Sequence, residues 1–329
     1  MNTVAGRHVF GAVTPDSLKA RYFVAKNAWL DRAYSRRFRQ HTAPLPDEVR
    51  SYLRADNPKL IDLQQRYSKA NAFTHTFWKN WRKHLDLSNF RAEGAYLSQG
   101  SDRTAESMYF AQTVYLEAVD EWHLLQSHRE DGLFGCHIFR FPPDRLVSRD
   151  LLDSIIEITF IRKALRLSKR DELRVLDIGA GYGRLAHRLL EAFPNGHVTN
   201  VDAVPESTFL CDFYTRFRGV GDRSRTLGAD EIDKLSGERF DIATNVHSWS
   251  ECPREAVRRW MGVLRDLKVP LLFVVPHDDE FKSTERTGKD TFLPEITAAG
   301  YKEVARARKF QESATLHGAS PVLYALFAL

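Results

Sequence analysis

The most informative motif in the chain is Leu176-Asp177-Ile178-Gly179-Ala180-Gly181-Tyr182-Gly183. It follows a short apolar run and precedes an amphipathic segment, which is typical of the turn between a strand and the next helix. Glycines at alternate positions let the backbone turn tightly and approach a ligand with no Cβ in the way. The stretch therefore predicts a nucleotide-like ligand beside the end of a strand.

Two details distinguish this turn from the related turn of dinucleotide-binding enzymes. The third glycine is Gly183, whereas Arg184 stands one position later, where those enzymes have it. An acid, Asp177, comes just before the first glycine. Its carboxylate would repel a pyrophosphate and attract the ammonium group of a methionine moiety, directly or through water. We therefore expect a cationic ligand; a purely structural glycine turn is the alternative.

Acidic residues follow the next two expected strands. Asp202 ends the first of them, where a carboxylate can accept hydrogen bonds from both ribose hydroxyls. Dehydrogenases share this feature, so it favours an adenosine ligand without choosing the class. Asp230 and Glu231 follow the second strand, where the amino group of adenine can be met. Their alternative role is as acids at the start of a helix, favoured by its dipole.

The chain after Arg174 alternates short β-branched runs with amphipathic segments, which predicts an α/β, Rossmann-like parallel sheet with helices on both faces. We expect seven strands, at Val175 to Ile178, His197 to Asp202, Arg225 to Leu227, Phe240 to Val246, Leu271 to Val275, Val304 to Phe310 and Val322 to Phe327. Expected helices include Arg184 to Phe193 and Pro253 to Leu267. Only the loop Gln311 to Pro321 joins the last two strands. Because it is too short for a crossover helix, the last strand should be antiparallel.

The spacing of apolar residues up to about residue 165 is mostly helical. One stripe, after a cap at Ser101 or Asp102, consists of Met108, Ala111, Tyr115, Ala118, Trp122 and Leu125. Aromatic residues for which core packing is the more usual role are Phe77, Trp78, Trp81, Phe90 and Tyr96. We predict a mainly helical domain over residues 1–147, acting as a lid that selects the acceptor, and a ligand-binding domain over residues 148–329.

Composition places the chain among ordinary globular proteins: 329 residues, 43% hydrophobic and 28% charged. The start lacks the features of a signal peptide, and three cysteines without CxxC spacing favour a reducing cytoplasm. No apolar run is long enough for a membrane span. The net charge of the chain is +5, and the first fifty residues alone account for an excess of five, with nine Lys/Arg against four Asp/Glu. Its cluster of arginines from 32 to 39 predicts a solvated helix face or an anionic partner, and the near-neutral remainder argues against nucleic acid.

The run from Asp177 to Gly183, together with Asp202, resembles the motifs of class I S-adenosylmethionine-dependent methyltransferases. The resemblance covers about residues 148 to 329 and implies S-adenosylmethionine as the cofactor. The cofactor-binding residues that follow are Asp177, Gly179, Ala180, Gly181, Gly183, Asp202, Ala203, Asp230, Glu231, Asn245, Ser148 and Arg149.

The segment Asn245 to Glu251 leaves the fourth strand at its carboxyl end, where such a sheet presents catalytic groups. It lacks the (Asn/Asp)-Pro-Pro-aromatic sequence of methylases that act on bases, which disfavours base methylation. It is similar to the corresponding segment of a sugar O-methyltransferase family, which is also echoed in Phe90 to Tyr96 and Val147 to Ser154. Gly94 and Arg149 stand where we would expect an amide residue, which weakens the match.

The resemblance implies O-methylation of a hydroxyl on a sugar or glycoside. The most specific expectation is an actinobacterial enzyme that acts on mannosides or methylmannose polysaccharides. A hydroxyl needs a base that takes its proton during transfer, and His247 is the best-placed candidate, with Glu251 as its partner carboxylate. Asp278 is a further catalytic candidate, and Asp278 with Asp279 is a candidate Mg²⁺ site or a plain solvated loop. The candidate acceptor-binding residues are Tyr96, Trp249, Ser248 and His277.

Alternatives remain for several of these expectations. His247 can instead be a structural histidine at a strand end, and Trp249 can pack in the core. The whole chain can be a methyltransferase of another small molecule, or a non-catalytic adenosyl-binding protein. A small-molecule or oligosaccharide acceptor and a homodimer are the expected partners. The sequence does not choose the sugar, the hydroxyl or the metal dependence.

Overall fold

In a computed structural model of the chain, the described residues are 44–69, 78, 84–100, 102–142, 144–285, 288–310 and 322–329. The arginine cluster between residues 32 and 39, Phe77, Trp81 and Ser101 lie outside them.

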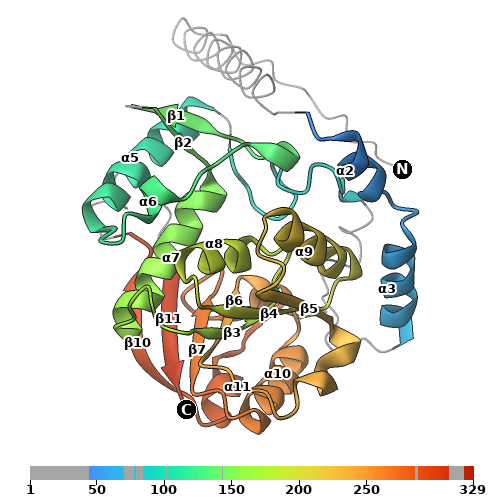
Figure 1. The fold of residues 1–329 in the computed structure, drawn as a ribbon. Coiled ribbons are helices and arrows are strands. Elements are labelled where there is room, and N and C mark those ends of the chain that lie inside the picture. Colours follow the sequence, from blue (N-terminus) through green and yellow to red (C-terminus); the bar gives the residue numbers. More distant parts are fainter. Residues whose placement is uncertain are drawn as a thin grey trace, which may run out of the picture.

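The described N-terminal part is mainly helical, as predicted (Figure 1). Its elements are α2 (Asp47–Tyr52), α3 (Pro58–Lys69), α5 (Arg103–Val119), α6 (Leu124–Ser127), the 3-10 helix η2 (Leu133–Gly135), β1 (Phe139–Phe141) and β2 (Arg145–Val147). The strands β1 and β2 form an antiparallel hairpin that the sequence did not predict. Asp102 caps α5 by accepting a hydrogen bond from the backbone of Ala105.

The rest of the chain alternates strands and helices. In order these are α7 (Arg149–Leu165), β3 (Arg174–Ile178), α8 (Arg184–Ala192), β4 (His197–Asp202), α9 (Pro205–Phe217), β5 (Ser224–Gly228), η3 (Ala229–Leu235), β6 (Ile242–Val246), η4 (Ser248–Glu251), α10 (Arg254–Asp266), β7 (Leu271–Val275), β8 (Lys282–Thr284), β9 (Lys289–Thr291), α11 (Leu293–Ala298), β10 (Lys302–Arg308) and β11 (Leu323–Ala328).

Seven of these strands form one sheet in the order β10-β11-β7-β6-β3-β4-β5. The strands from β3 to β7 are parallel, and β11 runs antiparallel to both of its neighbours, β7 and β10. The prediction of seven strands with the last one reversed is confirmed, and each strand begins and ends within two residues of its expected position. The β8–β9 hairpin was not predicted.

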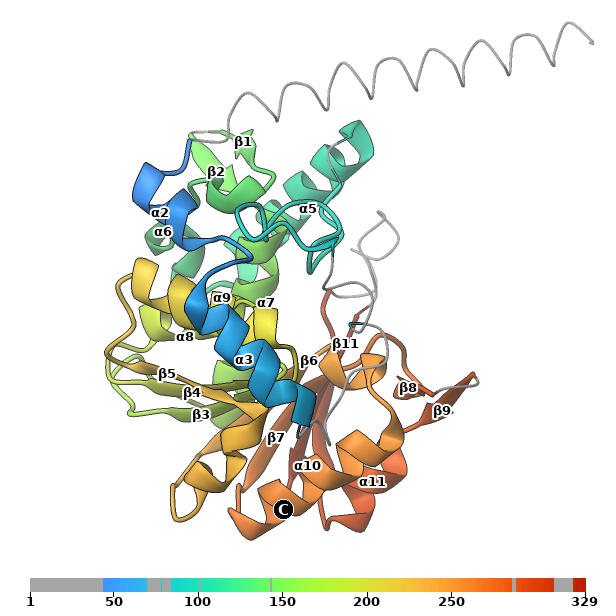
Figure 2. The ribbon, with the colours of Figure 1, turned by 90° about the vertical axis from the view of Figure 1, so that its right-hand side faces the viewer.

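Helices cover both faces of the sheet, with α7, α8 and α9 on one side and α10 and α11 on the other (Figures 1 and 2). The alternation of side chains along each strand explains this arrangement. In β7, Phe273 and Val275 pack with α7 and α8, whereas Leu272 and Val274 pack with α10 and α11. A strand buried on both faces reads as a continuous apolar run, as Leu271 to Val275 does.

The apolar stripe expected on α5 is wrong in detail. The helix ends at Val119, and Ala111 and Ala118 are exposed. The buried residues of the helix are Ala105, Tyr109, Gln112, Thr113 and Leu116. Of the expected stripe, Leu125 is buried, and Met108, Tyr115 and Trp122 pack partly buried against the same core. The buried face includes two polar residues, of which Thr113 donates its hydroxyl to the Tyr109 carbonyl at 2.7 Å.

The described N-terminal elements share their cores with the sheet domain. The helix α5 packs in one cluster with α7 and α8, and α3 packs with α9 in another. The division at residues 147 and 148 into a lid domain and a ligand-binding domain stays a prediction. Among the described residues, no helix is long and apolar enough to cross a membrane.

Candidate active site

A cavity of about 720 Å³, its open mouth included, lies at the carboxyl ends of β3, β4 and β6. Predicted site residues that line it are Tyr96, Asp177, Gly179, Ala180, Gly181, Asp202, His247, Ser248 and Glu251. Residues brought from distant parts of the chain thus meet around one space.

The glycine turn forms the floor of this cavity and requires glycine at its key positions. Gly179 has a φ of 72°, and a Cβ there would lie 2.2 Å from the side chain of Ser248. Gly183 has a φ of 86°, and a Cβ there would lie 3.0 Å from the sulfur of Cys211. The backbone of Gly179 donates to the Val201 carbonyl at 2.8 Å, which joins the turn to β4. Glycine at these two positions therefore lets the turn pack directly against Ser248 and Cys211.

Asp202, at the end of β4, is held in position by backbone donors. One carboxylate oxygen accepts from the N–H of Gly181 at 2.9 Å and the other from the N–H of Val204 at 2.8 Å. Because each carboxylate oxygen has a second lone pair, two acceptor positions remain. Burial raises the pKa of Asp202 to about 7, although both N–H bonds lower it. The side chain is a candidate acceptor for two hydroxyls.

Asp177 lies deeper under the turn, with only 3% of its surface exposed. Its carboxylate accepts from the hydroxyl of Thr244 at 2.6 Å, across the paired strands β3 and β6. Burial raises its pKa to about 6, and the bond from Thr244 opposes the shift. Arg184 also lines the cavity, but its guanidinium is bound to Glu157 at 2.9 and 3.0 Å. The described lining residues therefore include three carboxylates, those of Asp177, Asp202 and Glu251, and one cation, Arg184, whose charge is already paired.

The opposite wall carries a histidine and an acid, His247 and Glu251, and a second histidine, His277, lies next to both. His247 follows β6 with a φ of 66°, an unusual conformation for a non-glycine residue that is common near functional sites. Its Nδ1 is buried without a hydrogen-bond partner among the described residues. The ring of His247 lies 5.1 Å from that of His277, centre to centre. Glu251 approaches His277 at 3.6 Å and accepts from the indole N–H of Trp78 at 3.0 Å.

This geometry changes the expected partner of His247 and sets its protonation state. The carboxylate assigned to His247 contacts His277 instead. Burial, with the nearby His277, lowers the pKa of His247 to about 3, well below the ordinary value of a histidine. The imidazole is therefore neutral throughout the physiological range. That is the form a proton acceptor needs, although its low pKa makes it a weak base.

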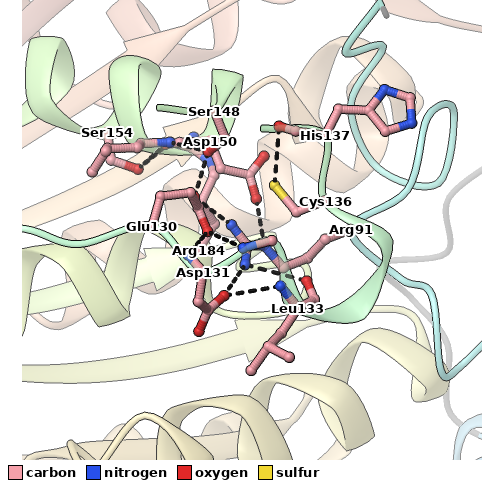
Figure 3. A network of polar contacts seen from close by, with 12 residues as sticks. Arg91, Glu130, Asp131, Leu133, Cys136, His137, Ser148, Asp150, Ser154 and Arg184 are labelled. Carbon is pink, nitrogen blue, oxygen red and sulfur yellow. Dashed lines mark hydrogen bonds and ion pairs between the residues drawn. The ribbon is translucent and has the colours of Figure 1, made fainter. Parts of the chain in front are cut away.

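The remaining predicted cofactor-binding residues lie outside the lining of the cavity. Ser148 is buried in the network of Figure 3, where it caps α7 and donates to Glu130. Arg149 binds Asp153 at 3.2 Å. Asn245 joins the turn to η4, because its side chain donates to Ile178 at 2.8 Å and accepts from the Trp249 backbone at 3.0 Å. Gly183 and Ala203 stand just beside lining residues, and Asp230 and Glu231 bind Arg66 of α3.

Two expectations on the acceptor side meet a different environment. The ring of Trp249 is only 1% exposed and packs edge-on against Phe292, so the core alternative describes it. The Asp278 carboxylate accepts from the backbone of Glu280 at 3.0 Å, and Asp279 pairs with Arg308 at the surface. Within the described residues, no group of three His, Cys, Asp or Glu is arranged to hold a metal ion, so the Mg²⁺ expectation finds no support.

Three lining residues with aromatic or charged side chains, Trp78, Tyr182 and Arg184, were not predicted as part of the site. Trp78 was expected in the core, yet it lies in the cavity wall with its ring 4.9 Å from that of Tyr96. Arg184 was noted only as the residue that replaces a glycine; its place on the first turn of the helix was the available signal. Tyr182 belongs to the glycine turn, and its hydroxyl donates to Asp150.

A buried ion network supports the turn from behind (Figure 3). Arg91 donates to Asp150 and to Glu130, both at 2.8 Å, and none of the Arg91 side chain is exposed. Arg91 and a second cation, Arg188, hold the pKa of Glu130 well below its usual range against the effect of burial. Removing one partner of such a buried network leaves an uncompensated charge and destabilises a protein by about 3–5 kcal/mol. The network fixes the start of α7 and, through Tyr182, the turn itself.

The order of the strands, with β11 reversed between β7 and β10, and the glycine turn after β3 together decide the class of fold. The chain has the class I methyltransferase fold. No family model matches the chain. Ribosomal RNA small subunit methyltransferase G of Methylibium petroleiphilum is 22% identical to it over 190 residues, which cover 56% of this chain and 84% of the relative.

Several solved structures are remotely similar. The [4+2]-cyclase SpnF is 17% identical, with 66% of this chain and 95% of that chain covered and a TM-score of 0.40. A SAM-dependent methyltransferase from Aquifex aeolicus is 14% identical, with 52% and 87% covered and a TM-score of 0.37. An O-methyltransferase family 2 protein from Planctomyces limnophilus, in complex with apigenin, is 14% identical, with 55% and 58% covered and a TM-score of 0.39. The class I methyltransferase fold alone does not choose a reaction.

Proposed function

We propose that this protein binds S-adenosylmethionine and transfers its methyl group to a hydroxyl of a small acceptor, with a sugar or glycoside as the acceptor class. The observation that carries the proposal is the cavity in which the glycine turn and the Asp202 carboxylate face His247 and Glu251. One wall suits an adenosyl ligand, and the other offers groups that can handle a proton.

The donor half of the cavity fits a cationic adenosyl ligand. Two acceptor positions on Asp202 remain for ribose hydroxyls, and glycines without side chains border the space. The lining carboxylates favour the ammonium and sulfonium charges of the donor and disfavour a pyrophosphate. Arg184 cannot offset this preference because Glu157 already binds it through two nitrogens. Asp177, Asp202 and the glycine turn are the residues proposed to hold the donor.

When bound, S-adenosylmethionine supplies an activated methyl group for in-line displacement, so the protein contributes mainly alignment and removal of a proton. His247, neutral at physiological pH, is proposed to accept the proton of the hydroxyl. Because burial opposes its charged form, a nearby carboxylate must offset that charge. Glu251 is in reach through His277, which it approaches at 3.6 Å.

An aromatic wall supports a sugar-like acceptor. The rings of Trp78 and Tyr96 line the cavity beside Glu251, and the indole of Trp78 donates to its carboxylate. Aromatic faces combined with a few polar groups suit a ligand with one apolar face and several hydroxyls. The role expected of Trp249 is therefore proposed for Trp78. A mannoside is the specific acceptor to test first.

The test is transfer of a labelled methyl group from S-adenosylmethionine to a panel of mannosides, other glycosides and phenols. We expect transfer to at least one glycoside by the wild-type chain and little by His247→Ala. Methylation of phenols alone would contradict the acceptor class. Tight donor binding with no transfer to any acceptor in the panel would instead favour a non-catalytic adenosyl-binding protein.

A further inference from the structure

The helix α3 lies along α9 and reaches the carboxyl ends of β4 and β5 (Figure 2). Leu60 and Leu63 on one of its faces are buried in a cluster with Phe209 of α9. At its edge, Gln64 donates to Glu206 at 2.7 Å. A segment more than 100 residues upstream of these strands in the sequence is thus attached to the donor half of the cavity.

Tyr67 of α3 ties the ends of two strands together with one hydroxyl. The hydroxyl donates to the backbone carbonyl of Asp202 at 3.0 Å and accepts from the backbone N–H of Ala229 at 3.0 Å. It also shares a hydrogen bond with Thr208 at 2.7 Å. The tyrosine is only 5% exposed. The residue proposed to bind ribose therefore has its backbone fixed by α3 and its carboxylate fixed by the glycine turn.

Arg66, the preceding residue, binds the two acids that follow β5. Its guanidinium donates to Asp230 at 2.8 and 2.9 Å and lies 3.0 Å from Glu231. Both carboxylates had been expected to meet the amino group of adenine. Since they are engaged by Arg66 and lie outside the cavity lining, their contacts fit an anchor for α3 rather than a direct ligand contact.

We propose that α3 is a latch that sets donor affinity, with Tyr67 and Arg66 as positioning residues and Asp230 as the anchor of Arg66. This inference rests on the proposed function, since it assumes that the donor binds beside Asp202. Tyr67 acts through Asp202 by holding the ends of β4 and β5 at a fixed separation. Without the latch, a smaller fraction of the molecules has the binding arrangement, and the apparent dissociation constant rises in proportion.

The first test measures binding of S-adenosylhomocysteine to the full chain by titration calorimetry. Tyr67→Phe keeps the ring and removes three hydrogen bonds, so we expect binding about 5- to 30-fold weaker. Tyr52→Phe is the matched control, because the Tyr52 hydroxyl contacts Arg216 of the same helix α9 at 3.4 Å, at its exposed side. The control should stay within about twofold of wild type. Equal or tighter binding by folded Tyr67→Phe would overturn the latch.

The second test uses partly exposed residues, so that it does not depend on substituting a fully buried side chain. The test is a double-mutant cycle of Arg66→Met and Asp230→Asn. If Asp230 acts only by anchoring Arg66, the double variant should bind S-adenosylhomocysteine no more weakly than the single variant with the lower affinity. A full additional loss on adding Asp230→Asn to Arg66→Met would mean that Asp230 contacts the donor directly, and would overturn its role as an anchor. Failure of the wild-type chain to bind S-adenosylhomocysteine would refute the proposed function itself.

Discussion

Donor affinity should rise with pH through the neutral range, because Asp202 must be ionised to accept two ribose hydroxyls. Burial raises its pKa to about 7, and burial raises that of Asp177 to about 6. The free protein therefore holds protons on these carboxylates below neutral pH, and binding of the donor must release them. Because both pKa values are higher in the folded than in the unfolded chain, they contribute to the stability of the folded protein. This contribution is fully present below about pH 4 and is lost as the pH rises through 6 and 7.

The magnitude follows from the pKa of Asp202. At about one pH unit below its pKa, roughly one-tenth of the carboxylate is ionised, which weakens the apparent affinity about tenfold, or about 1.4 kcal/mol. The affinity should level off above about pH 8, where Asp202 is fully ionised. Below about pH 6 the slope should steepen, because Asp177 begins to take up a proton as well.

The assay is calorimetric titration of S-adenosylhomocysteine at several pH values, repeated in buffers with different ionisation enthalpies to count the protons released. Asp202→Asn is the matched variant, because it keeps the shape of the side chain without its titration. We expect weak binding by this variant, with a dependence on pH much shallower than that of wild type. If the affinity of the wild-type chain stays constant from about pH 6 to pH 8, or if the Asn variant binds as well as wild type at pH 8, ionisation of Asp202 does not control donor binding.

Three further predictions concern other parts of the site. His247→Ala and His247→Asn should each lower turnover by roughly 10² to 10⁴ while donor affinity stays nearly unchanged. Because the pKa of His247 is about 3, the wild-type rate should not change with the ionisation of this histidine near pH 6.5. Near wild-type rates in both variants would mean that His247 has a structural role. Gly179→Ala should abolish donor binding, because its Cβ would lie 2.2 Å from the Ser248 side chain, and donor titration of the folded variant checks this. Excess chelator should cause at most a modest loss of activity; if the loss is large and a variant lacking Asp278 and Asp279 reproduces it, a metal site exists after all.

The sequence predicted the sheet well because its signals are local. A strand buried on both faces is a short apolar run, and the glycines of the turn have positive φ angles that other residues adopt only rarely. The short connection between β10 and β11 was enough to predict that β11 is reversed. These features need no knowledge of distant contacts.

The partners within the site could not be predicted because they depend on long-range packing. Glu251 is close to His247 in sequence, yet it contacts His277, which arrives on the loop after β7. Trp78 and Trp249 look alike in the sequence, and only the fold places the first in the cavity and the second in the core. From the sequence, Asp230 was predicted to contact the adenine, whereas in the structure it binds Arg66 of α3.

Binding of S-adenosylmethionine in the cavity is best tested by calorimetric titration of wild type and Asp202→Ala with three ligands. We expect the wild-type chain to bind S-adenosylmethionine and S-adenosylhomocysteine but not NAD, and Asp202→Ala to lose most of this affinity. Equal donor affinity in the two proteins, or tight binding of NAD, would contradict this expectation.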